Sequence, residues 1–475
     1  MGHKHADSLS LPDRKLQAPI YLQLYRRYKD AISAGRLKPG DRVPAIRSLA
    51  SELNLSRGTV EAAYQMLIGE GYLEARGPAG TVVSPRLTQA SGLALPPEEA
   101  AVPCRARERY RDTSTRPFQL GLPALDVFPT KLWRRLMTRR LRDIATTALG
   151  YPDPAGYRPL RERITSYLGI SRGIQCSPEQ VFITAGYQGA LDLICHCLMR
   201  SGDQVWFEDP GYYYARRQLV GNGARLVPIP VDEQGLNVDL GLQHAPNAGF
   251  AVITPSHQSP LGVALALPRR LELLQWANQV GSWIIEDDYD SEYRYEGHPL
   301  PALKSLDQQG RVLYTGTFSK VLFPGLRLGY LVVPASEVER FQDACHTFSG
   351  GCFTLAQATI SDFMNEGHFA RHLKKMRSLY AQRRAYMAQA LRDAFGERLH
   401  IRLQAGGMHL LAELVDGDDI ELAAKAQADG LAVHALSHWC LETQCRPSLL
   451  LGFTNVTSED EAKHLAERLR AALIH

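Results

Sequence analysis

The sequence predicts a multi-domain protein: a small three-helix unit with a β-wing, then a large α/β domain that ends in a small α+β lobe. The chain has 475 residues, 45% hydrophobic and 22% charged, so it is long enough for several cores and too apolar to be disordered. Short helical patterns and a Gly-rich turn fill the first eighty residues. From about residue 117, short apolar runs alternate with longer helical patterns, which is typical of an α/β domain.

Composition excludes two classes of protein and leaves nucleic-acid binding open. No apolar run of about 18 residues occurs, so we expect no membrane span. The polar first ten residues hold no secretory signal, so we expect a cytoplasmic protein. The net charge is only +4, but residues 1–84 hold 12 Lys/Arg against 8 Asp/Glu, residues 85–116 hold 6 against 4, and the remainder holds 36 against 38. The N-terminal part therefore carries the basic excess.

The eight cysteines are not spaced like a metal site, because none of them forms a Cys-x-x-Cys pair. Cys195 and Cys197 flank His196 in an apolar stretch, residues 191–198, that predicts a buried helix. Two interpretations remain at this point: a metal site, or small core residues kept reduced inside the cell. We favour the second and expect no bound metal.

Three helices and a wing are predicted in the first eighty residues. Apolar residues recur at the spacing of one helix face within 21–28, 46–53 and 60–67, and Ser56 is a good N-cap for the third helix. Two short helices joined by about three residues make a helix-turn-helix. Residues 72–83 predict two strands around a Gly-Pro-Ala-Gly turn, which together form the wing.

The polar residues of this unit suit contact with DNA. A recognition helix reads the major groove with its N-terminal residues, where arginine can bridge guanine and hydroxyl groups can contact bases or phosphates. The residues that we expect to contact DNA are Arg47, Ser56, Arg57, Thr59, Arg76 and Gly80. The alternative is a three-helix protein-interaction domain with a solvated basic face.

The domain boundaries are predicted at 1–84 for the N-terminal unit, 85–116 for a Pro-rich, charged linker and 117–475 for the large domain. Near-continuous apolar strands predict a largely parallel sheet. The expected strands are 180–184, 204–208, 249–254, 282–286 and 311–315, and the expected helices include 191–199, 269–280 and 356–363. The small lobe spans about 340–475, with a helix around 380–395 and strands near 407–414 and 447–453.

Polar residues cluster after the predicted strands, where ligands of such sheets bind. Residues 286–288 follow one strand, residues 317–320 follow another, and residues 184–188 offer helix N-terminal amides to an anion. A lysine, a carboxylate, an aromatic ring and an anion loop together suit pyridoxal 5′-phosphate (PLP), because lysine binds its aldehyde and a carboxylate keeps its ring nitrogen protonated. Each feature alone also has an ordinary explanation, as a solvated turn or a surface lysine.

Three motifs mark the N-terminal unit: Gly-Arg-Leu-Lys-Pro-Gly-Asp-Arg-Val-Pro at 35–44, Arg-Ser-Leu-Ala-Ser-Glu-Leu at 47–53 and Ser-Arg-Gly-Thr-Val at 56–60. They resemble the winged helix-turn-helix of GntR-type bacterial regulators, and the resemblance implies the DNA contacts named above. That family usually has Pro-Ser-x-Arg where this chain has Pro44-Ala45-Ile46-Arg47, so one hydroxyl group is missing and the arginine remains.

A lysine motif, Ser319-Lys320-Val-Leu-Phe-Pro-Gly-Leu-Arg327, marks the large unit. Together with Tyr-Pro-Asp-Pro-Ala-Gly at 151–156, Glu-Asp-Pro-Gly-Tyr at 208–212 and Asp-Asp-Tyr-Asp at 287–290, it resembles the fold-type I PLP-dependent aminotransferases. A GntR-type unit fused to such a domain resembles the MocR-type transcriptional regulators. The two resemblances together cover more than four fifths of the chain.

The resemblance implies a role for each site residue. Lys320 forms the Schiff base with PLP, Asp287 pairs with the ring nitrogen, and Tyr289 bonds the ring hydroxyl. Tyr212 stacks on the ring. The residues placed around the phosphate are Tyr187, Gln188, Thr317, Ser319 and Arg327, with Tyr151 reaching the phosphate of the neighbouring subunit in a head-to-tail homodimer.

Two departures from the aminotransferase pattern bear on the ligand. Ser259-Pro260-Leu261-Gly262 stands where aminotransferases have Asn-Pro-x-Gly, so the usual contact to the ring hydroxyl is lost or made by Gln258. The usual arginine for the substrate carboxylate is leucine or serine here, and Arg446, a few residues early, is the remaining candidate for an effector contact. An amino-acid effector is therefore in doubt, and the cofactor itself can be the signal.

Three functions stay open at this point. The first, which we favour, is a dimeric transcriptional regulator in which PLP, or PLP with an amine ligand, modulates binding of the winged helix to promoter DNA, with repeated half-sites. The second is a working aminotransferase with a DNA-binding head, which the lysine and aspartate permit and the altered carboxylate site disfavours. The third is a regulator without cofactor whose large domain is vestigial. We do not expect catalysis to be the main role of this protein.

Overall fold

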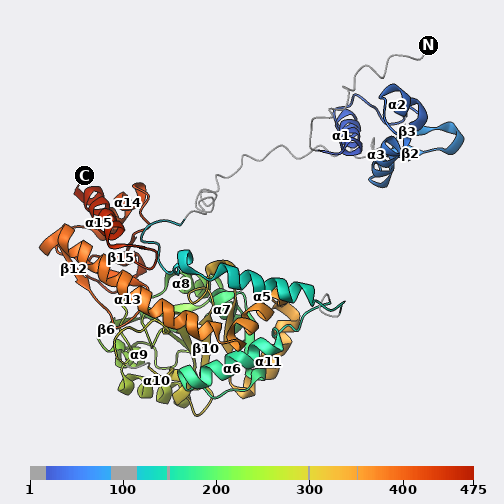
Figure 1. The fold of residues 1–475 in the computed structure, drawn as a ribbon. Helices are drawn as coiled ribbons and strands as arrows, with labels where there is room; N and C mark the ends of the chain where they lie inside the picture. The colour runs from blue at the N-terminus through green and yellow to red at the C-terminus, as the bar shows by residue number, and fades with distance from the viewer. Residues whose placement is uncertain (1–17, 87–114, 147–149, 298–299, 350, 475) are drawn as a thin grey trace. The chain divides into compact units, whose positions relative to one another are not determined.

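The chain folds as two compact units, residues 1–113 and 114–475, which we name the head and the large unit and describe separately (Figure 1). The structure is a computed structural model that describes residues 18–86, 115–146, 150–297, 300–349 and 351–474. The predicted linker, 85–116, lies almost wholly outside the described residues. The finer domain boundaries therefore stay predictions.

The described residues of the head, 18–86, form three α-helices and a three-stranded antiparallel sheet. The helices are α1 (Ile20–Ser33), α2 (Ile46–Glu52) and α3 (Arg57–Gly69), and the strands are β1 (Arg42–Val43), β2 (Leu73–Ala75) and β3 (Thr81–Val83), in the order β1-β3-β2. The predicted helices and the two strands of the wing are confirmed. Sequence periodicity missed β1, because a strand of two residues has no period and exists only through its pairing with β3.

A pair of buried tyrosines holds the helices of the head together. The rings of Tyr28 on α1 and Tyr64 on α3 meet edge to face, with centroids 5.5 Å apart. The Tyr64 hydroxyl donates to the carbonyl of Pro44 at 3.0 Å and lies 3.2 Å from the Tyr28 hydroxyl. Because Pro44 lies just before α2, this one side chain sets both the packing of α3 on α1 and the start of α2.

An eight-stranded, mostly parallel sheet forms the centre of the large unit. Its order is β4-β11-β10-β9-β8-β5-β6-β7, and β10, β9, β8, β5 and β6 run parallel to one another. The strands are β4 (Val181–Thr184), β5 (Gln204–Asp209), β6 (Arg225–Asp232), β7 (Gly235–Leu236), β8 (Phe250–Ile253), β9 (Trp283–Asp288), β10 (Val312–Thr317) and β11 (Gly329–Val332). All five predicted strands are confirmed. The missed β6 carries two prolines, which are tolerated near the edge of a sheet and mask its strand pattern.

Helices pack on the two faces of this sheet, as an α/β fold requires. They are α5 (Thr130–Arg142), α6 (Arg158–Arg172), α7 (Gly186–Leu198), α8 (Tyr213–Gly221), α9 (Val238–His244), α10 (Leu267–Val280), α11 (Val338–Ala344) and α12 (Thr354–Asn365). Phe207 packs in one core with residues of α7, α8 and α11, while its neighbour Trp206 stacks on Trp276 of α10 at 3.9 Å. In the described part of the chain, no helix is long and apolar enough to cross a membrane.

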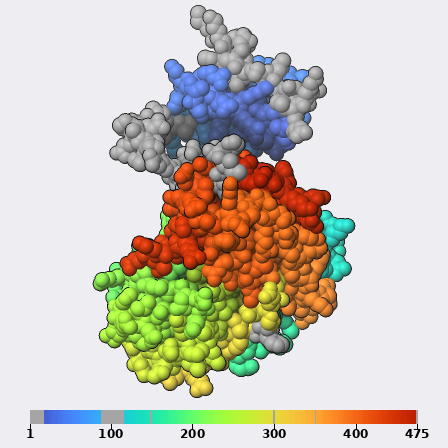
Figure 2. All heavy atoms as spheres, turned by 90° about the vertical axis from the view of Figure 1, so that its left-hand side faces the viewer, coloured from blue at the N-terminus to red at the C-terminus, as the bar shows by residue number. Residues whose placement is uncertain are grey.

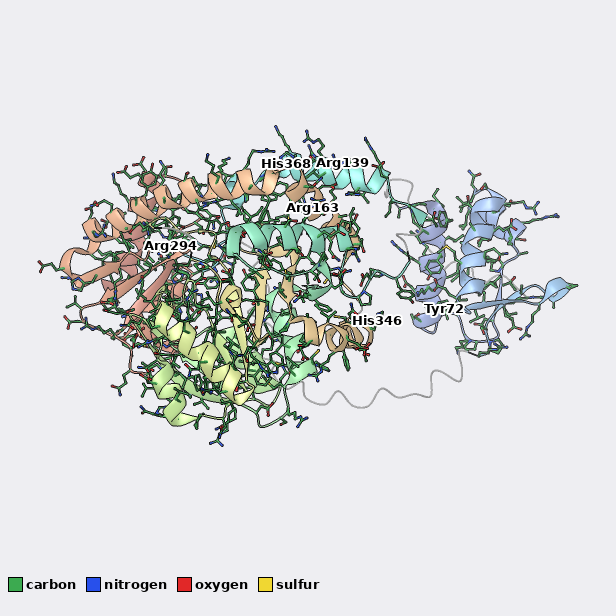
Figure 3. The ribbon with its side chains drawn as sticks, turned by 90° about the horizontal axis from the view of Figure 1, so that it is seen from below. Tyr72, Arg139, Arg163, Arg294, His346 and His368 are labelled. Carbon is green, nitrogen blue, oxygen red and sulfur yellow. The ribbon has the colours of Figure 1, made fainter. Side chains whose placement is uncertain are left out.

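Ion pairs connect α5 to α12 on one side of the large unit, where Figure 3 labels Arg139 and His368. The Arg139 guanidinium lies 3.0 Å from Asp362 and 2.5 Å from Glu366, and Arg140 lies 2.5 Å from Asp362. Both arginines lower the pKa of Asp362 against the opposing effect of its burial. These contacts fix α5 to the C-terminal end of α12.

The C-terminal part forms the predicted small α+β lobe. Its elements are α13 (His368–Phe395), β12 (Leu399–Arg402), β13 (His409–Leu414), α14 (Asp419–Ala428), β14 (His434–Ala435), β15 (Ser448–Gly452) and α15 (Glu459–Ile474). The four strands form an antiparallel sheet in the order β12-β13-β15-β14. In Figure 2 the orange and red residues, which include this lobe, form a continuous face of the large unit beside the green and yellow residues of the central sheet.

Candidate functional site

The N-terminus of α3 in the head is capped and exposed. The Ser56 hydroxyl accepts a hydrogen bond from the backbone N–H of Thr59 at 3.1 Å and lies 2.7 Å from the Thr59 hydroxyl. This confirms Ser56 as the N-cap and shows that both hydroxyls first stabilise the helix end. Arg57, the first residue of α3, is exposed, as is Arg47 near the start of α2.

The wing places another basic residue beside its turn. Arg76 is exposed, and its Nε lies 3.6 Å from the Glu74 carboxylate. Gly80 has φ +92°, and a Cβ on it would lie 3.2 Å from Nε of Arg42, whose guanidinium donates to the carbonyl of Ala79. Sequence analysis missed Arg42, because only the pairing of β1 with β3 brings it to the wing.

Lys320 lies just beyond the C-terminal end of β10, near the buried carboxylates Asp287 and Asp290. Its Nζ donates to the carbonyl of Gly121 at 3.0 Å. Gly121 has φ +65°, and a Cβ there would lie only 2.1 Å from Nζ, so glycine is needed both for the backbone and for the lysine. Burial lowers the pKa of Lys320, while the carboxylates Asp290 and Asp287 raise it.

Three successive carboxylates lie on β9 itself, which corrects the expectation that they follow the strand. Glu286 accepts the backbone N–H groups of Leu303 and Lys304, both at 2.8 Å. Asp288 forms a buried ion pair with Arg172 at 2.8 Å and accepts from the Tyr314 hydroxyl at 2.5 Å. These two carboxylates are therefore committed to the structure of the large unit.

Asp287, between them, has no such partner. It is 6% exposed, and among the described residues its side chain has one hydrogen bond, from the Thr315 hydroxyl at 3.5 Å, and no ion pair. Burial, the Asp288 carboxylate and then Glu208 raise its pKa well above the usual range. A buried carboxylate without a cation is costly, so this position fits a cationic ligand atom such as a protonated ring nitrogen.

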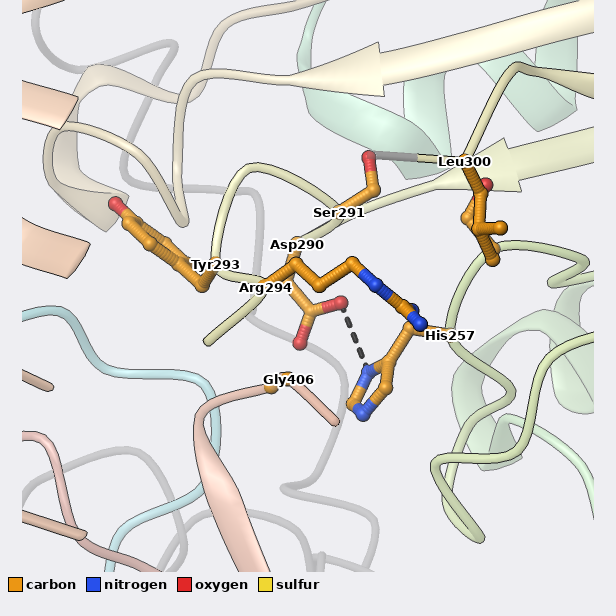
Figure 4. A pocket seen from close by; sticks show the side chains of 9 residues that line it. His257, Asp290, Ser291, Tyr293, Arg294, Leu300 and Gly406 are labelled. Carbon is orange, nitrogen blue, oxygen red and sulfur yellow. Dashed lines mark hydrogen bonds and ion pairs between the residues drawn. The ribbon is translucent and has the colours of Figure 1, made fainter. Parts of the chain in front are cut away.

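His257 contacts both Tyr289 and Asp290, and Figure 4 shows its contact with Asp290. Nδ1 of His257 lies 2.9 Å from the Tyr289 hydroxyl and 3.0 Å from Asp290 Oδ1. His257 and Asp290 line a small pocket together with Ser256 and Arg294. Sequence analysis gave His257 no role, because its partners lie 32 and 33 residues away in the chain.

The glutamine of the turn that replaces Asn-Pro-x-Gly connects the turn to the end of β5. Nε2 of Gln258 donates to the carbonyls of Pro210 (2.8 Å) and Ser259 (2.9 Å), and Oε1 accepts the N–H of Leu261 at 2.9 Å. Gln258 is 1% exposed. The amide is thus occupied by the turn and by the end of β5 with the residue after it, and His257 rather than Gln258 contacts Tyr289.

The predicted aromatic and anion-binding residues come together from separate motifs. The rings of Tyr187 and Tyr212 meet at 6.0 Å between centroids. Gln188, in the first turn of α7, accepts from the Arg327 guanidinium at 3.2 Å across 139 residues of sequence. The Thr317 hydroxyl accepts the backbone N–H of Ser319 at 3.1 Å.

Two predicted residues lie apart from this group. Tyr151 is 104% exposed. The Arg446 side chain is 85% exposed and lies 4.0 Å from Glu413. Glu413 lies at the C-terminal end of β13, whereas His409 begins this strand. His409, which sequence analysis missed, is near His257, with ring centroids 6.2 Å apart, and burial lowers its pKa.

Comparison with known proteins gives matches for both units. Residues 20–83 match the bacterial regulatory proteins of the gntR family, and residues 125–469 match aminotransferase class I and II. The chain is 37% identical over 454 residues to the probable rhizopine catabolism regulatory protein MocR of Rhizobium meliloti, covering 94% of this chain and 92% of that protein. It is 31% identical to the pyridoxine biosynthesis transcriptional regulator PdxR of Corynebacterium glutamicum, covering 91% and 92%.

The large unit also resembles a solved enzyme structure. The crystal structure of Pyrococcus horikoshii kynurenine aminotransferase in complex with PMP matches with a TM-score of 0.68 and 28% sequence identity. The match covers 76% of this chain and 91% of that one. The central sheet and the small lobe therefore follow the architecture of PLP-dependent aminotransferases.

Proposed function

The chain belongs to the MocR-type transcriptional regulators of the GntR family, and from this premise we propose that PLP bound at Lys320 sets how strongly the head binds promoter DNA. It is a DNA-binding transcriptional regulator with PLP as cofactor. The observation that carries the proposal is the buried, unpaired Asp287 within electrostatic reach of Lys320.

The residues present fit PLP. The cofactor, when bound, supplies an aldehyde that reacts with amines and a ring that withdraws electrons. Because burial lowers its pKa, the Lys320 amine is more readily neutral and nucleophilic than an exposed lysine. Asp287 would accept the ring N–H, Tyr212 would cover one ring face, and Arg327 with Gln188 would hold the phosphate.

The position of Arg446 favours a sensor over a catalyst. A transaminase needs a cation for the carboxylate of its amino acid, and the exposed Arg446 points instead to Glu413 at 4.0 Å. The corresponding strand, β15, contributes only Ser448, three leucines and a glycine. We therefore propose that PLP itself, or PLP with a small amine, is the signal.

We also propose that the chain forms a head-to-tail homodimer in the cytoplasm. The dimer would bind promoter DNA that carries repeated half-sites. The fully exposed ring of Tyr151 supports this, since an aromatic side chain of that exposure is suited to contact a second subunit. Its segment is anchored at the other end by the ion pair of Asp153 with Arg161 at 2.7 Å. In the dimer Tyr151 would reach the phosphate in the partner's site.

Substitution of the lysine tests the cofactor site. Lys320→Ala should abolish the visible absorbance that develops when PLP is added, and it should remove the effect of PLP on a promoter footprint. Lys374→Ala, at an exposed position of α13, is the matched control and should change neither. An unchanged spectrum in Lys320→Ala would refute the site, and rapid conversion of amino donors to keto acids by the wild-type protein would favour the enzyme.

Mixing two defective chains tests the shared site. Tyr151→Ala and Lys320→Ala homodimers should each bind PLP poorly or not at all. A mixed dimer has one site that combines Lys320 of the Tyr151→Ala chain with Tyr151 of the Lys320→Ala chain. One of the two sites of each mixed dimer should therefore regain wild-type affinity. If mixing restores nothing, Tyr151 does not serve the partner's site.

A further inference from the structure

Two thiols of the small lobe lie within reach of a bond. Sγ of Cys440 and Sγ of Cys445 are 2.8 Å apart, and both residues are half-buried free cysteines. They flank a four-residue loop between the turn Leu436–Trp439 and β15. At this separation the loss of two hydrogens closes a disulfide without a large movement of the backbone.

The two sulfurs are chemically unequal. The Cys440 thiol donates a hydrogen bond to Cys445, which lowers the pKa of Cys445 and raises that of Cys440. By contrast, burial raises the pKa of Cys195 and of Cys197 to about 12. A thiolate in a partly exposed place beside a second thiol is the usual setting of a redox-sensitive cysteine.

We propose that Cys445 and Cys440 form a peroxide-reactive pair that closes reversibly to an intrachain disulfide. The Cys445 thiolate attacks one oxygen of hydrogen peroxide, the O–O bond breaks, and a sulfenic acid and hydroxide form. The Cys440 thiol then attacks the Cys445 sulfur and forms the S–S bond, and the sulfenic oxygen leaves as water. The two sulfurs lose two electrons in total, the peroxide gains them, and a dithiol reductant reverses the reaction by exchange.

A buried carboxylate connects this loop to the central sheet. Asp209, the last residue of β5, is 0% exposed and accepts the backbone N–H groups of Leu441 (2.6 Å), Glu442 (2.8 Å) and Thr443 (2.7 Å). These are three of the four residues between the cysteines. The conformation of the cysteine loop is therefore set by the end of β5.

The next residues of the chain carry the aromatic wall of the proposed cofactor site. Gly211 N donates to the carbonyl of Trp439 at 3.1 Å, and the Arg216 guanidinium donates to that of Cys440 at 3.2 Å. The rings of Tyr212 and Trp439 lie 5.9 Å apart. Closing the disulfide moves the two sulfurs from 2.8 Å to bonding distance, and a small shift of Cys440 reaches Tyr212 through the adjacent Trp439 ring. We therefore expect oxidation to shift Tyr212 and with it the affinity for PLP, a coupling that depends on the proposed function.

Peptide mapping of the full chain tests the disulfide itself, without any cofactor. Treatment of the reduced protein with a few equivalents of hydrogen peroxide should give a Cys440–Cys445 linked peptide, lighter by two hydrogens, that dithiothreitol restores. Cys176→Ser is the matched control and should oxidise like the wild type, since burial raises the pKa of that thiol. Absence of the linked peptide, or a link to another cysteine, would overturn the proposal.

Single variants test which thiol attacks. In Cys440→Ser, peroxide should leave a sulfenic acid on Cys445 that dimedone traps, because the second thiol is missing. In Cys445→Ser, dimedone should label Cys440 at least tenfold more slowly, because burial still raises the pKa of the Cys440 thiol. Equal labelling in the two variants would refute the assigned roles.

The coupling has its own measurement, so that it can fail separately. The dissociation constant for PLP should differ between the oxidised and reduced wild-type protein and be unaffected by peroxide in Cys440→Ser. If the disulfide forms and the PLP affinity is unchanged, the coupling to Tyr212 is wrong while the reactive pair stands. If neither state binds PLP, the proposed function fails and the peptide mapping is unaffected.

Discussion

The head and the large unit place their functional residues in opposite environments. In the head, Arg47, Arg57 and Arg76 are exposed at the ends of short elements. The core cluster of the head consists of hydrophobic residues, and these arginines are not part of it. In the large unit, Asp287 is almost completely buried and Lys320 is half-buried. Two further carboxylates, Glu286 and Asp288, lie beside Asp287 on β9. A DNA reader needs charge that meets phosphates and bases, whereas a cofactor site needs charge held away from water.

This difference predicts how each unit responds to mutation. Removing an exposed arginine removes a contact with a ligand and leaves the fold unchanged. Changing a group near Lys320 alters the pKa of its neighbours and the packing of several elements together, because buried charges depend on their partners. The following substitutions test that contrast, beginning with the largest expected effect.

Gly121→Ala should abolish covalent binding of PLP. The new Cβ would lie 2.1 Å from Lys320 Nζ, so the amine must leave its place, and φ +65° adds strain of about 1–2 kcal/mol. Absorbance during a PLP titration measures the loss. Gly430→Ala is the matched control, since it has φ +80° with no atom near the new Cβ, and it should lose stability without losing PLP. Normal PLP binding by Gly121→Ala would show that the lysine is not held by this glycine.

His372→Gln should flatten the acid side of the stability profile of the large unit. His372 is 8% exposed and contacts the carbonyl of Val321 at 3.0 Å, and burial lowers its pKa from 6.5 to about 4. Between these values the folded protein binds fewer protons than the unfolded chain. The wild type is therefore fully stabilised above pH 6.5 and loses roughly 3 kcal/mol as the pH falls to 4.

The same experiment separates the two units, because residues 18–86 of the head contain no histidine. Urea unfolding at several pH values, followed by tryptophan fluorescence, reports on the large unit alone, since all five tryptophans lie in it. His464→Gln, at an exposed position of α15, should keep the wild-type pH dependence. An identical profile for His372→Gln would exclude this histidine as the source.

Arg57→Ala should weaken binding to the specific promoter site by about 1–3 kcal/mol if the side chain reads a base. PLP binding should stay unchanged, because the residue is exposed in the other unit. Arg26→Ala, on an exposed position of α1, should have a smaller and sequence-independent effect. Unaltered operator affinity and selectivity in Arg57→Ala would remove it from the readout.

Ser56→Ala should lower the stability of the head by about 1 kcal/mol, since the cap to the Thr59 N–H at 3.1 Å is lost. Hydrogen exchange of the first-turn amides of α3 in the full chain measures the change. Ser51→Ala, on exposed surface of α2, should leave these amides protected as before. Equal protection in Ser56→Ala would mean that the hydroxyl serves DNA rather than the helix.

Local sequence pattern was sufficient for the helices and the wing of the head and for the middle of the large sheet. The stripe of Tyr21, Leu24, Tyr25 and Tyr28 predicts α1, and the start of α3 follows from Ser56, because helix periodicity and capping are properties of neighbouring residues. The five apolar strands were found for the same reason. Strand β1 was missed because it exists only through its pairing with the distant β3, and β6 was missed because its prolines mask the strand pattern.

The candidate site divides in the same way. Lys320, Asp287 and Arg327 lie in motifs that can be read along the chain, and so does the fusion of a DNA-binding head to a cofactor domain. The tertiary structure alone shows that Gly121 holds the lysine, that Asp287 lacks the partners of its neighbours, and that Cys440 meets Cys445. Residue type and short-range spacing decide what chemistry a chain can carry, whereas pKa, orientation and reactivity depend on which distant atoms folding brings within a few ångströms.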